Sequence, residues 1–376
     1  MLRNIAYIIL LITFLFIITA CEEKVGEEID PIDRVQGTDS PRPTVKGVEN
    51  VDVLKHVSSI NGLERMERFY KNTQQGVSSD LRIVHYTFEG APIVTDLNYD
   101  GETMKITFDT SRNKYGSGEI TTTKCSKLVE EVNPTNTTYI AVDCSDGRSG
   151  MVEILALDYN LKQQDLFEFE LKFGNGLKNE VNTNTRKTTR VNSLTKIKKT
   201  NDLQMSPKVK QEVFKRLVLT LSDIELETNC HTKKFEEYNL KVYINSAEEE
   251  FHWSSCDKSS QGAKFTKIAE YIIAQSEMEQ EENPETVIQG YILKVKDDTL
   301  LIGVDFSRLE YEWLKNEIGN IDLSLYAFKY IFLEGVENEE FKIGDKIEAV
   351  LNGSITNTHP GKAKVKEIKR INVPGL

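Results

Sequence analysis

The sequence lacks the short motifs of the common hydrolases and nucleotide-binding proteins. It contains no His-Glu-x-x-His zinc motif, no nucleophile elbow and no phosphate-binding glycine loop. Two bare Ser-x-x-Lys matches occur, at residues 193–196 and 255–258, without the companion motifs of penicillin-recognising enzymes. These absences predict a protein with no enzymatic activity and no cofactor.

The sequence also has fewer positively charged residues than negatively charged ones. The 376 residues include 47 Lys and Arg against 59 Asp and Glu, which gives a net charge of −12. Nucleic-acid binding requires net or locally concentrated positive charge. The composition therefore argues against a nucleic-acid partner, and against broad electrostatic adhesion to an anionic membrane.

Long apolar runs are absent beyond Ile18, and the mean hydropathy of the chain is −0.40. The one such run, Ile5 to Ile18, comes after the positive charge of Arg3. A membrane-spanning helix needs roughly 20 apolar residues, whereas the core of a signal peptide needs roughly 7 to 15. The run therefore favours a signal peptide, with an uncleaved membrane anchor as the alternative.

The apolar run ends in the tetrapeptide Ile18-Thr19-Ala20-Cys21. This tetrapeptide resembles the lipobox of bacterial lipoproteins, in which an aliphatic residue and two small residues precede a cysteine. The resemblance implies cleavage before Cys21 and a diacylglyceryl group on its sulfur, and two acyl chains suffice for stable anchoring. We therefore expect an extracytoplasmic lipoprotein on the outer face of the cell membrane.

Cysteine is scarce, and four residues remain once Cys21 carries lipid: Cys125, Cys144, Cys230 and Cys256. An even number in an exported protein predicts disulfides, although four cysteines allow three connectivities. Pairing neighbours along the chain, 125 with 144 and 230 with 256, keeps each bridge within one expected domain.

The second cysteine pair has a metal-binding alternative. Cys230-His231 and His252 with Cys256 together offer thiols and imidazoles, which are the ligands of tetrahedral zinc. In a regular strand, however, Cys230 and His231 would point to opposite faces. We therefore favour a disulfide and no metal, and free thiols remain a third possibility.

Composition and hydrophobic periodicity divide the chain into segments, and the fold class expected is α+β with several domains. Two helix-plus-antiparallel-sheet domains precede a small β-barrel of the oligonucleotide/oligosaccharide-binding type. In chain order we expect a signal peptide at 1–20, a disordered tether at 21–50, an α+β domain at 51–173, a linker at 174–204, a small α+β domain at 205–279, an acidic linker at 280–286 and the barrel-like domain at 287–376.

The first domain shows apolar residues at spacings of three and four from Leu54 to Tyr70, which predicts one long helix. Alternating strands come next, and Asp100-Gly101 predicts a tight hairpin. The linker at 174–204 is polar and rich in turn residues. It is also basic, through Arg186, Lys187, Arg190, Lys196, Lys198 and Lys199, and could touch anionic lipid or wall polymer.

The last domain alternates like five short strands with one helix near Leu309–Ile318. Aromatic side chains are typical of ligand-binding surfaces, and a candidate binding surface is formed by Tyr291, Tyr311, Trp313 and Tyr326.

Two regions resemble known domains of unknown function. Residues 51–157 look like an uncharacterised domain of lipoproteins from spore-forming Gram-positive bacteria, through the sequences at 51–56, 63–69, 95–101 and 139–144. Residues 287–373 are similar to a second such domain, through the sequences at 290–293, 342–347 and 358–363. The resemblance implies a location in the cell envelope and implies no chemistry.

Taken together, these features predict a lipid-anchored envelope protein that acts as a non-enzymatic binding module for a protein or cell-wall partner. The alternative is a metal-dependent hydrolase that uses the Cys/His set of residues 230–256.

Overall fold

The computed structural model describes residues 42–56, 60–87, 89–114, 118–146, 150–161, 166–191, 195, 198–220, 235–278, 286–315, 328–336 and 340–373. All of them belong to one compact unit that runs from Ser40 to Leu376. The predicted signal peptide and lipid site at Cys21 lie outside the described residues, as do Cys230, His231 and Tyr326.

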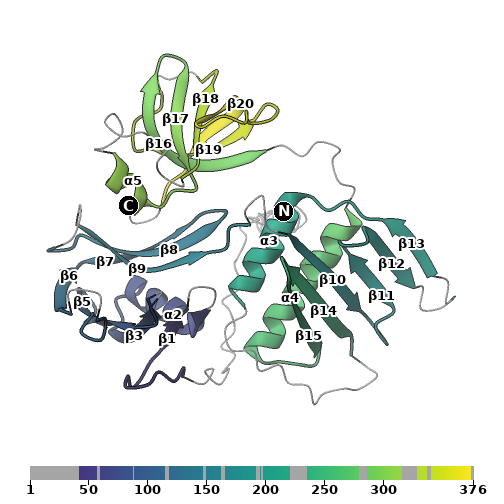
Figure 1. Cartoon of the computed structure of the whole chain (residues 1–376), viewed down its shortest axis with the longest axis horizontal. Helices are drawn as coiled ribbons and strands as arrows, with labels where there is room; N and C mark the ends of the chain where they lie inside the picture. Colours follow the sequence, from purple (N-terminus) through teal and green to yellow (C-terminus); the bar gives the residue numbers. More distant parts are fainter. Residues whose placement is uncertain are drawn as a thin grey trace, which may run out of the picture. The chain divides into compact units, whose positions relative to one another are not determined.

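The N-terminal part of the described chain combines one helix with two sheets (Figure 1). A six-stranded sheet has the order β2-β1-β3-β4-β5-β6, and a three-stranded sheet has the order β7-β8-β9. The elements are β1 (Val53–Lys55), β2 (Ile60–Asn61), α2 (Leu63–Gln74), β3 (Ser79–Tyr86), β4 (Pro92–Tyr99), β5 (Met104–Asp109), β6 (Ile120–Cys125), β7 (Lys127–Val132), β8 (Asn136–Val142) and β9 (Met151–Asp158).

Helix α2 and both sheets share one hydrophobic core. The helix contributes Leu63, Met66 and Phe69 to this core, and each of these side chains is at most 1% exposed. A disulfide between Cys125 and Cys144 joins the end of β6 to the residues after β8, as the sequence predicted. It ties the six-stranded sheet to the three-stranded sheet.

The predicted helix from Leu54 to Tyr70 is wrong in its first half. Val53–Lys55 and Ile60–Asn61 form strands, and α2 begins only at Leu63. The chain turns at Gly62, which has a φ of 79°. A Cβ atom there would lie 2.0 Å from the Asp52 carbonyl oxygen, so this close approach requires glycine. Before the turn, Leu54 and Ile60 lie in the paired strands β1 and β2. Their spacing from the helix residues is also that of a helix, so the pattern alone did not distinguish the two structures.

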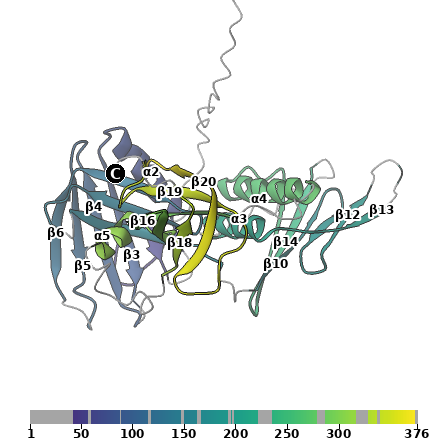
Figure 2. The same ribbon diagram turned by 90° about the horizontal axis from the view of Figure 1, so that it is seen from above.

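A second six-stranded sheet, with the order β13-β12-β11-β10-β14-β15, carries α3 and α4 on one face (Figures 1 and 2). Ser206 and Ser259 cap these two helices by accepting hydrogen bonds from backbone amides. The elements are β10 (Phe167–Phe173), β11 (Asn179–Asn182), β12 (Lys187–Val191), β13 (Lys198–Asp202), α3 (Pro207–Val218), β14 (Glu237–Ile244), β15 (Ala247–Ser254) and α4 (Ser260–Glu277).

The structure corrects the predicted linker at 174–204, because this segment supplies the three strands β11, β12 and β13. Strand β10, predicted to end the first domain, pairs with β14 in the same sheet. Only Val181 of this segment's strands enters the hydrophobic core, so their sequences look polar. Backbone pairing along the sheet, rather than an apolar face, holds them in place.

The C-terminal strands close into a five-stranded barrel with the order β16-β17-β18-β20-β19, which agrees with the predicted small barrel. Its helix α5 begins with a capping box between Ser307 and Glu310. The elements are β16 (Val287–Lys296), β17 (Thr299–Val304), α5 (Arg308–Leu314), β18 (Tyr330–Glu334), β19 (Lys346–Leu351) and β20 (Gly361–Arg370). Among the described residues, four helices accompany these sheets, so the fold is compatible with the predicted α+β class.

Candidate functional site

A seam between the two N-terminal sheets is the candidate binding site in the described structure. Strand β9 pairs with β8 along one edge, and no described strand pairs with its other edge. Across the seam, β1 runs parallel to β3, with Lys55 beside His85. The Lys55 Nζ atom donates a hydrogen bond to the carbonyl oxygen of Ala156 on β9. This bond bridges the seam.

Two adjoining clefts run along the open edge of β9. The first has a volume of about 470 Å³, and residues 153–156 of β9 form one wall. The second has a volume of about 550 Å³, and residues 156–158 line it together with side chains of α3, β14 and β15. Lys55, His56 and Ala156 line both clefts. Together, the two clefts border residues 153–158 of β9.

The walls of the first cleft combine apolar surface with a few polar groups. Ile83 and Phe108 come from the six-stranded sheet, and Ile154 comes from β9. The ring of His56 stacks on Tyr86 at a centroid distance of 5.2 Å and an angle of 21°. Apolar walls with few convergent polar groups are typical of ligand-binding sites.

Burial lowers the pKa of two basic side chains at the seam, Lys55 and His85. It lowers the pKa of Lys55, and the nearby carboxylates of Glu153 and Asp158 partly offset this effect by raising it. Burial, followed by the charge of Lys55, also lowers the pKa of His85. His85 is therefore neutral at pH 7, where its ring can both donate and accept a hydrogen bond.

The aromatic side chains predicted as a binding surface of the barrel do not form an open surface. Tyr291 and Tyr311 are only 2% and 5% exposed, and their rings stack at a centroid distance of 5.3 Å. Trp313 is half-buried, while Tyr326 lies outside the described residues. The two tyrosines pack inside the barrel domain with Leu293, Leu301 and Phe306, so a ligand cannot reach their faces.

Tyr291 instead contacts a carboxylate from the N-terminal part of the chain. Its hydroxyl group donates to Oε1 of Glu131, on β7, at 2.6 Å. The Nζ atom of Lys346 lies 2.8 Å from the same oxygen, and the backbone amide of Arg308 donates to Oε2 at 2.6 Å. The side chains of Glu131 and Lys346 are 0% and 3% exposed. We call these four residues the Glu131 cluster.

Sequence reasoning missed the Glu131 cluster. Glu131 and Lys346 are 215 residues apart, and neither lies in a motif. The one local signal was Tyr291 next to the apolar residues Ile292 and Leu293, because a buried tyrosine hydroxyl usually needs a hydrogen-bond partner. Such a signal gives no indication of which residue the partner is.

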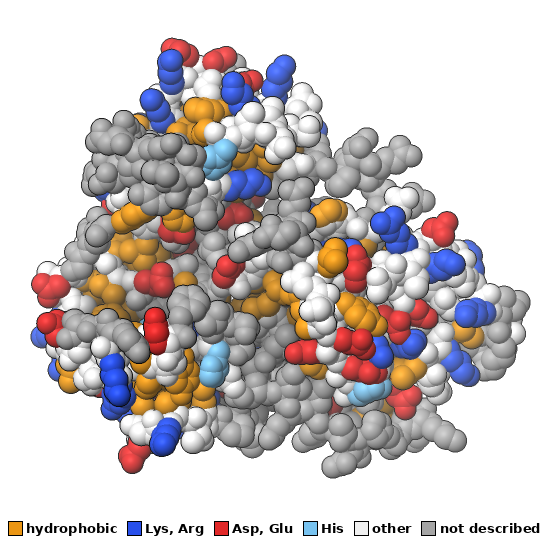
Figure 3. All heavy atoms as spheres, in the orientation of Figure 1, with side chains coloured by type: hydrophobic (Ala, Val, Ile, Leu, Met, Phe, Trp, Pro, Cys, Tyr) orange, Lys and Arg blue, Asp and Glu red, His pale blue; other side chains and the backbone are white. Residues whose placement is uncertain are grey.

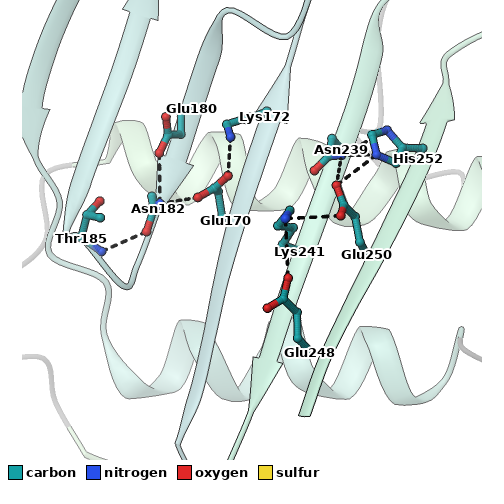
Figure 4. A network of polar contacts seen from close by, with 10 residues as sticks. All are labelled: Glu170, Lys172, Glu180, Asn182, Thr185, Asn239, Lys241, Glu248, Glu250 and His252. Atoms are coloured by element: carbon teal, nitrogen blue, oxygen red, sulfur yellow. Dashed lines mark hydrogen bonds and ion pairs between the residues drawn. The ribbon is translucent and has the colours of Figure 1, made fainter. Parts of the chain in front are cut away.

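The Cys/His set proposed for a metal is only partly described. Cys256 is disulfide-bonded, so its thiol is not available as a metal ligand. His252 lies on the exposed face of the second sheet, where Glu250 is 3.1 Å from its ring (Figure 4). Within the described ranges, no group of three or more His, Cys, Asp or Glu residues could hold a metal ion.

Comparisons with known proteins agree with an uncharacterised domain. Residues 50–140 match a family model described as a domain of unknown function, DUF4362. This match supports the resemblance seen for residues 51–157. No curated protein matches the chain.

Two solved structures from Bacillus subtilis show low similarity. A crystal structure of a YobA protein is 16% identical over 24% of this chain and 100% of that chain, with a TM-score of 0.18. A solution structure of YobA residues 21–120 is 15% identical over 26% of this chain and 92% of that chain, with the same TM-score of 0.18. In addition, no helix in the described part of the chain is long and apolar enough to cross a membrane.

Proposed function

We propose that the protein is a lipid-anchored envelope protein that binds an extended polypeptide segment in the seam beside β9. The anchor is supported by the apolar run before Ile18-Thr19-Ala20-Cys21. The binding site is supported chiefly by one observation, the two adjoining clefts along an edge of β9 with which no described strand pairs. The barrel domain, which we assign to the oligonucleotide/oligosaccharide-binding type, has its tyrosines occupied by the chain itself.

The chemistry of a strand edge favours a polypeptide ligand. An unpaired edge presents a row of backbone N–H and C=O groups, and an extended segment can satisfy them by adding a strand. Alternate side chains of that segment would then point toward the apolar walls at Ile83 and Phe108. His85, neutral at pH 7, and Lys55 offer polar contacts at the same place.

This mode of binding needs no catalytic group. Among the described residues that line the clefts, there is no Ser, Thr or Cys hydrogen-bonded to a base, which nucleophilic catalysis would require. We assign the seam a binding role because its strand edge can pair with an extended segment.

The proposal is tested by selecting binders from a displayed library of random short peptides against the full chain. We expect the selected peptides to lose at least about tenfold in affinity for an Ala156→Trp variant, because the indole would obstruct the place where the two clefts adjoin. Ile120→Trp, at a position 64% exposed on β6, is the matched control and should bind normally.

Backbone methylation of a selected peptide gives a second, independent readout. If the peptide adds a strand, methylating alternate amide nitrogens removes donors to β9 and weakens binding, while methylating the intervening ones does not. Equal effects at both sets of positions, or enrichment of the same peptides by the Ala156→Trp variant, would refute strand addition at this seam.

A further inference from the structure

The hairpin formed by β12 and β13 carries a local excess of positive charge. The segment 186–199 contains six basic residues and no acidic residue, in a chain whose net charge is −12. Its described basic side chains are largely exposed at the outer end of the second sheet (Figure 3), and these are Arg186, Lys187, Lys198 and Lys199.

None of these four side chains forms an ion pair in the described part of the chain, although Lys187 lies opposite Asp202 in the pairing of β12 with β13. Arg190 behaves differently, because its guanidinium group lies 3.3 Å from Glu277 and 4.8 Å from the centroid of the Phe173 ring. Arg190 therefore fixes the hairpin to α4, while the remaining charges face solvent.

The opposite end of the same sheet has the opposite charge. Strand β15 carries Glu248, Glu249 and Glu250 in succession, and Lys241 on β14 compensates only part of this charge (Figure 4). The sheet is thus basic at the β13 edge and acidic at the β15 edge. Such segregation orients a protein next to a charged surface.

An anionic bilayer is the partner that fits this edge. The proposed lipid on Cys21 would hold the chain next to a membrane, and up to about 3.5 Å per residue of the intervening tether gives it ample reach. Exposed lysine and arginine side chains are attracted to anionic headgroups, and this attraction decays within a Debye length of the surface.

We propose that the β12–β13 hairpin is a membrane-contacting surface that docks the second sheet onto anionic lipid headgroups. This inference rests on the proposed lipid anchor, but it does not depend on what the seam binds. Lysines on an edge strand can also serve only to prevent edge-to-edge aggregation. That alternative predicts no dependence on lipid charge.

The test uses the full lipidated chain reconstituted into two kinds of vesicle, phosphatidylcholine alone and phosphatidylcholine mixed with phosphatidylglycerol. Amide hydrogen exchange is measured in β12 and β13. We expect slower exchange with the anionic vesicles only, and loss of this difference at high salt.

Charge-neutralising variants provide the matched comparison. Each basic group near an anionic surface contributes about fivefold to binding, so Lys198→Gln with Lys199→Gln should weaken docking about 25-fold. The control is Lys105→Gln with Lys124→Gln, a pair of exposed lysines that face each other across β5 and β6. The control should dock like the unmodified chain.

The outcomes separate the inference from the proposed function. Failure of the chain to float with either vesicle would refute the anchor on which the inference rests. Flotation with equal exchange in both vesicles would overturn the hairpin assignment and leave the anchor intact. Aggregation of the Lys198/Lys199 variant without any lipid dependence would likewise overturn it, in favour of edge protection.

Discussion

The Glu131 cluster and the seam beside β9 both place polar groups between separate sheets, but they differ in how completely those groups are paired. Glu131 receives hydrogen bonds from Tyr291, Lys346 and the Arg308 amide, and its side chain is fully buried. At the seam, no described strand pairs with the outer edge of β9, and Lys55 donates one hydrogen bond to it. The groups of the Glu131 cluster are paired within the chain, which is why the proposed function places binding at the seam instead.

The free-energy cost of burying charged groups explains why the groups of the Glu131 cluster bind one another. Removing a carboxylate and an ammonium group from water costs several kcal/mol per ion, which their attraction repays only in good geometry with further hydrogen bonds. The Glu131 cluster meets this condition, since the tyrosine hydroxyl and a backbone amide complete the coordination of the carboxylate. Burial, followed by the charge of Glu131, raises the pKa of Tyr291, which therefore stays protonated as a donor.

The largest expected effect comes from breaking the Glu131 cluster. Glu131→Gln leaves the Lys346 ammonium buried without a counter-charge and should lower the free energy of unfolding by about 3–5 kcal/mol. Denaturant unfolding of the full chain measures this change.

A double variant provides the control for this effect. Glu131→Leu combined with Lys346→Met removes both charges and should be considerably more stable than Glu131→Gln, because no buried charge is left alone. A Glu131→Gln variant as stable as the unmodified chain would show that the pair is not buried in solution.

An intermediate effect is expected at the seam, through pH. The folded-state pKa of His85 is lowered, so the unfolded chain binds a proton at this site more readily, with an ordinary pKa of about 6.5. Stability should therefore fall as the pH decreases below about 6.5, until the folded-state pKa is reached. In His85→Gln this decrease should be shallower, as measured by unfolding at a series of pH values. An unchanged slope would mean that His85 is solvated.

The smallest effect is expected on the exposed face of the second sheet. There, Glu250 forms the same kinds of contact as Glu131, but its side chain is exposed to solvent. It accepts a hydrogen bond from Asn239 at 2.6 Å and lies 3.3 Å from Lys241 (Figure 4). Exposed ion pairs contribute little and are screened by salt. Glu250→Gln should therefore unfold at nearly the same denaturant concentration as the unmodified chain, although it is the same substitution as Glu131→Gln. A large destabilisation by Glu250→Gln would show that burial does not cause the difference between the two substitutions.

The parts of the fold that the sequence predicted are those in which local pattern and burial agree. The barrel strands are short runs rich in apolar residues beside a turn signal, and the structure has strands at Val287–Lys296 and Thr299–Val304 on either side of Asp297-Asp298. The disulfide between Cys125 and Cys144 was predictable from an even number of cysteines in an expected exported chain.

The parts that could not be predicted depend on partners far away in the sequence. Strands β11 to β13 have little apolar surface, and only their successive pairing, which starts from β11 beside β10, shows that they are strands. The Glu131 cluster joins β7 to the barrel, and the seam exists only once two separate sheets have formed. No local periodicity carries such information, so both sites were invisible in the sequence.

The proposed function requires that an extended segment binds at β9 and not at the barrel tyrosines. The most direct test is amide hydrogen exchange of the full chain with and without a selected peptide. Strand addition at β9 predicts that the peptide slows amide exchange in Met151–Asp158 and leaves it unchanged in Val287–Lys296 and Arg308–Leu314. Slower exchange in β16 and α5, with no change in β9, would contradict binding at β9 and would place the binding site on the barrel.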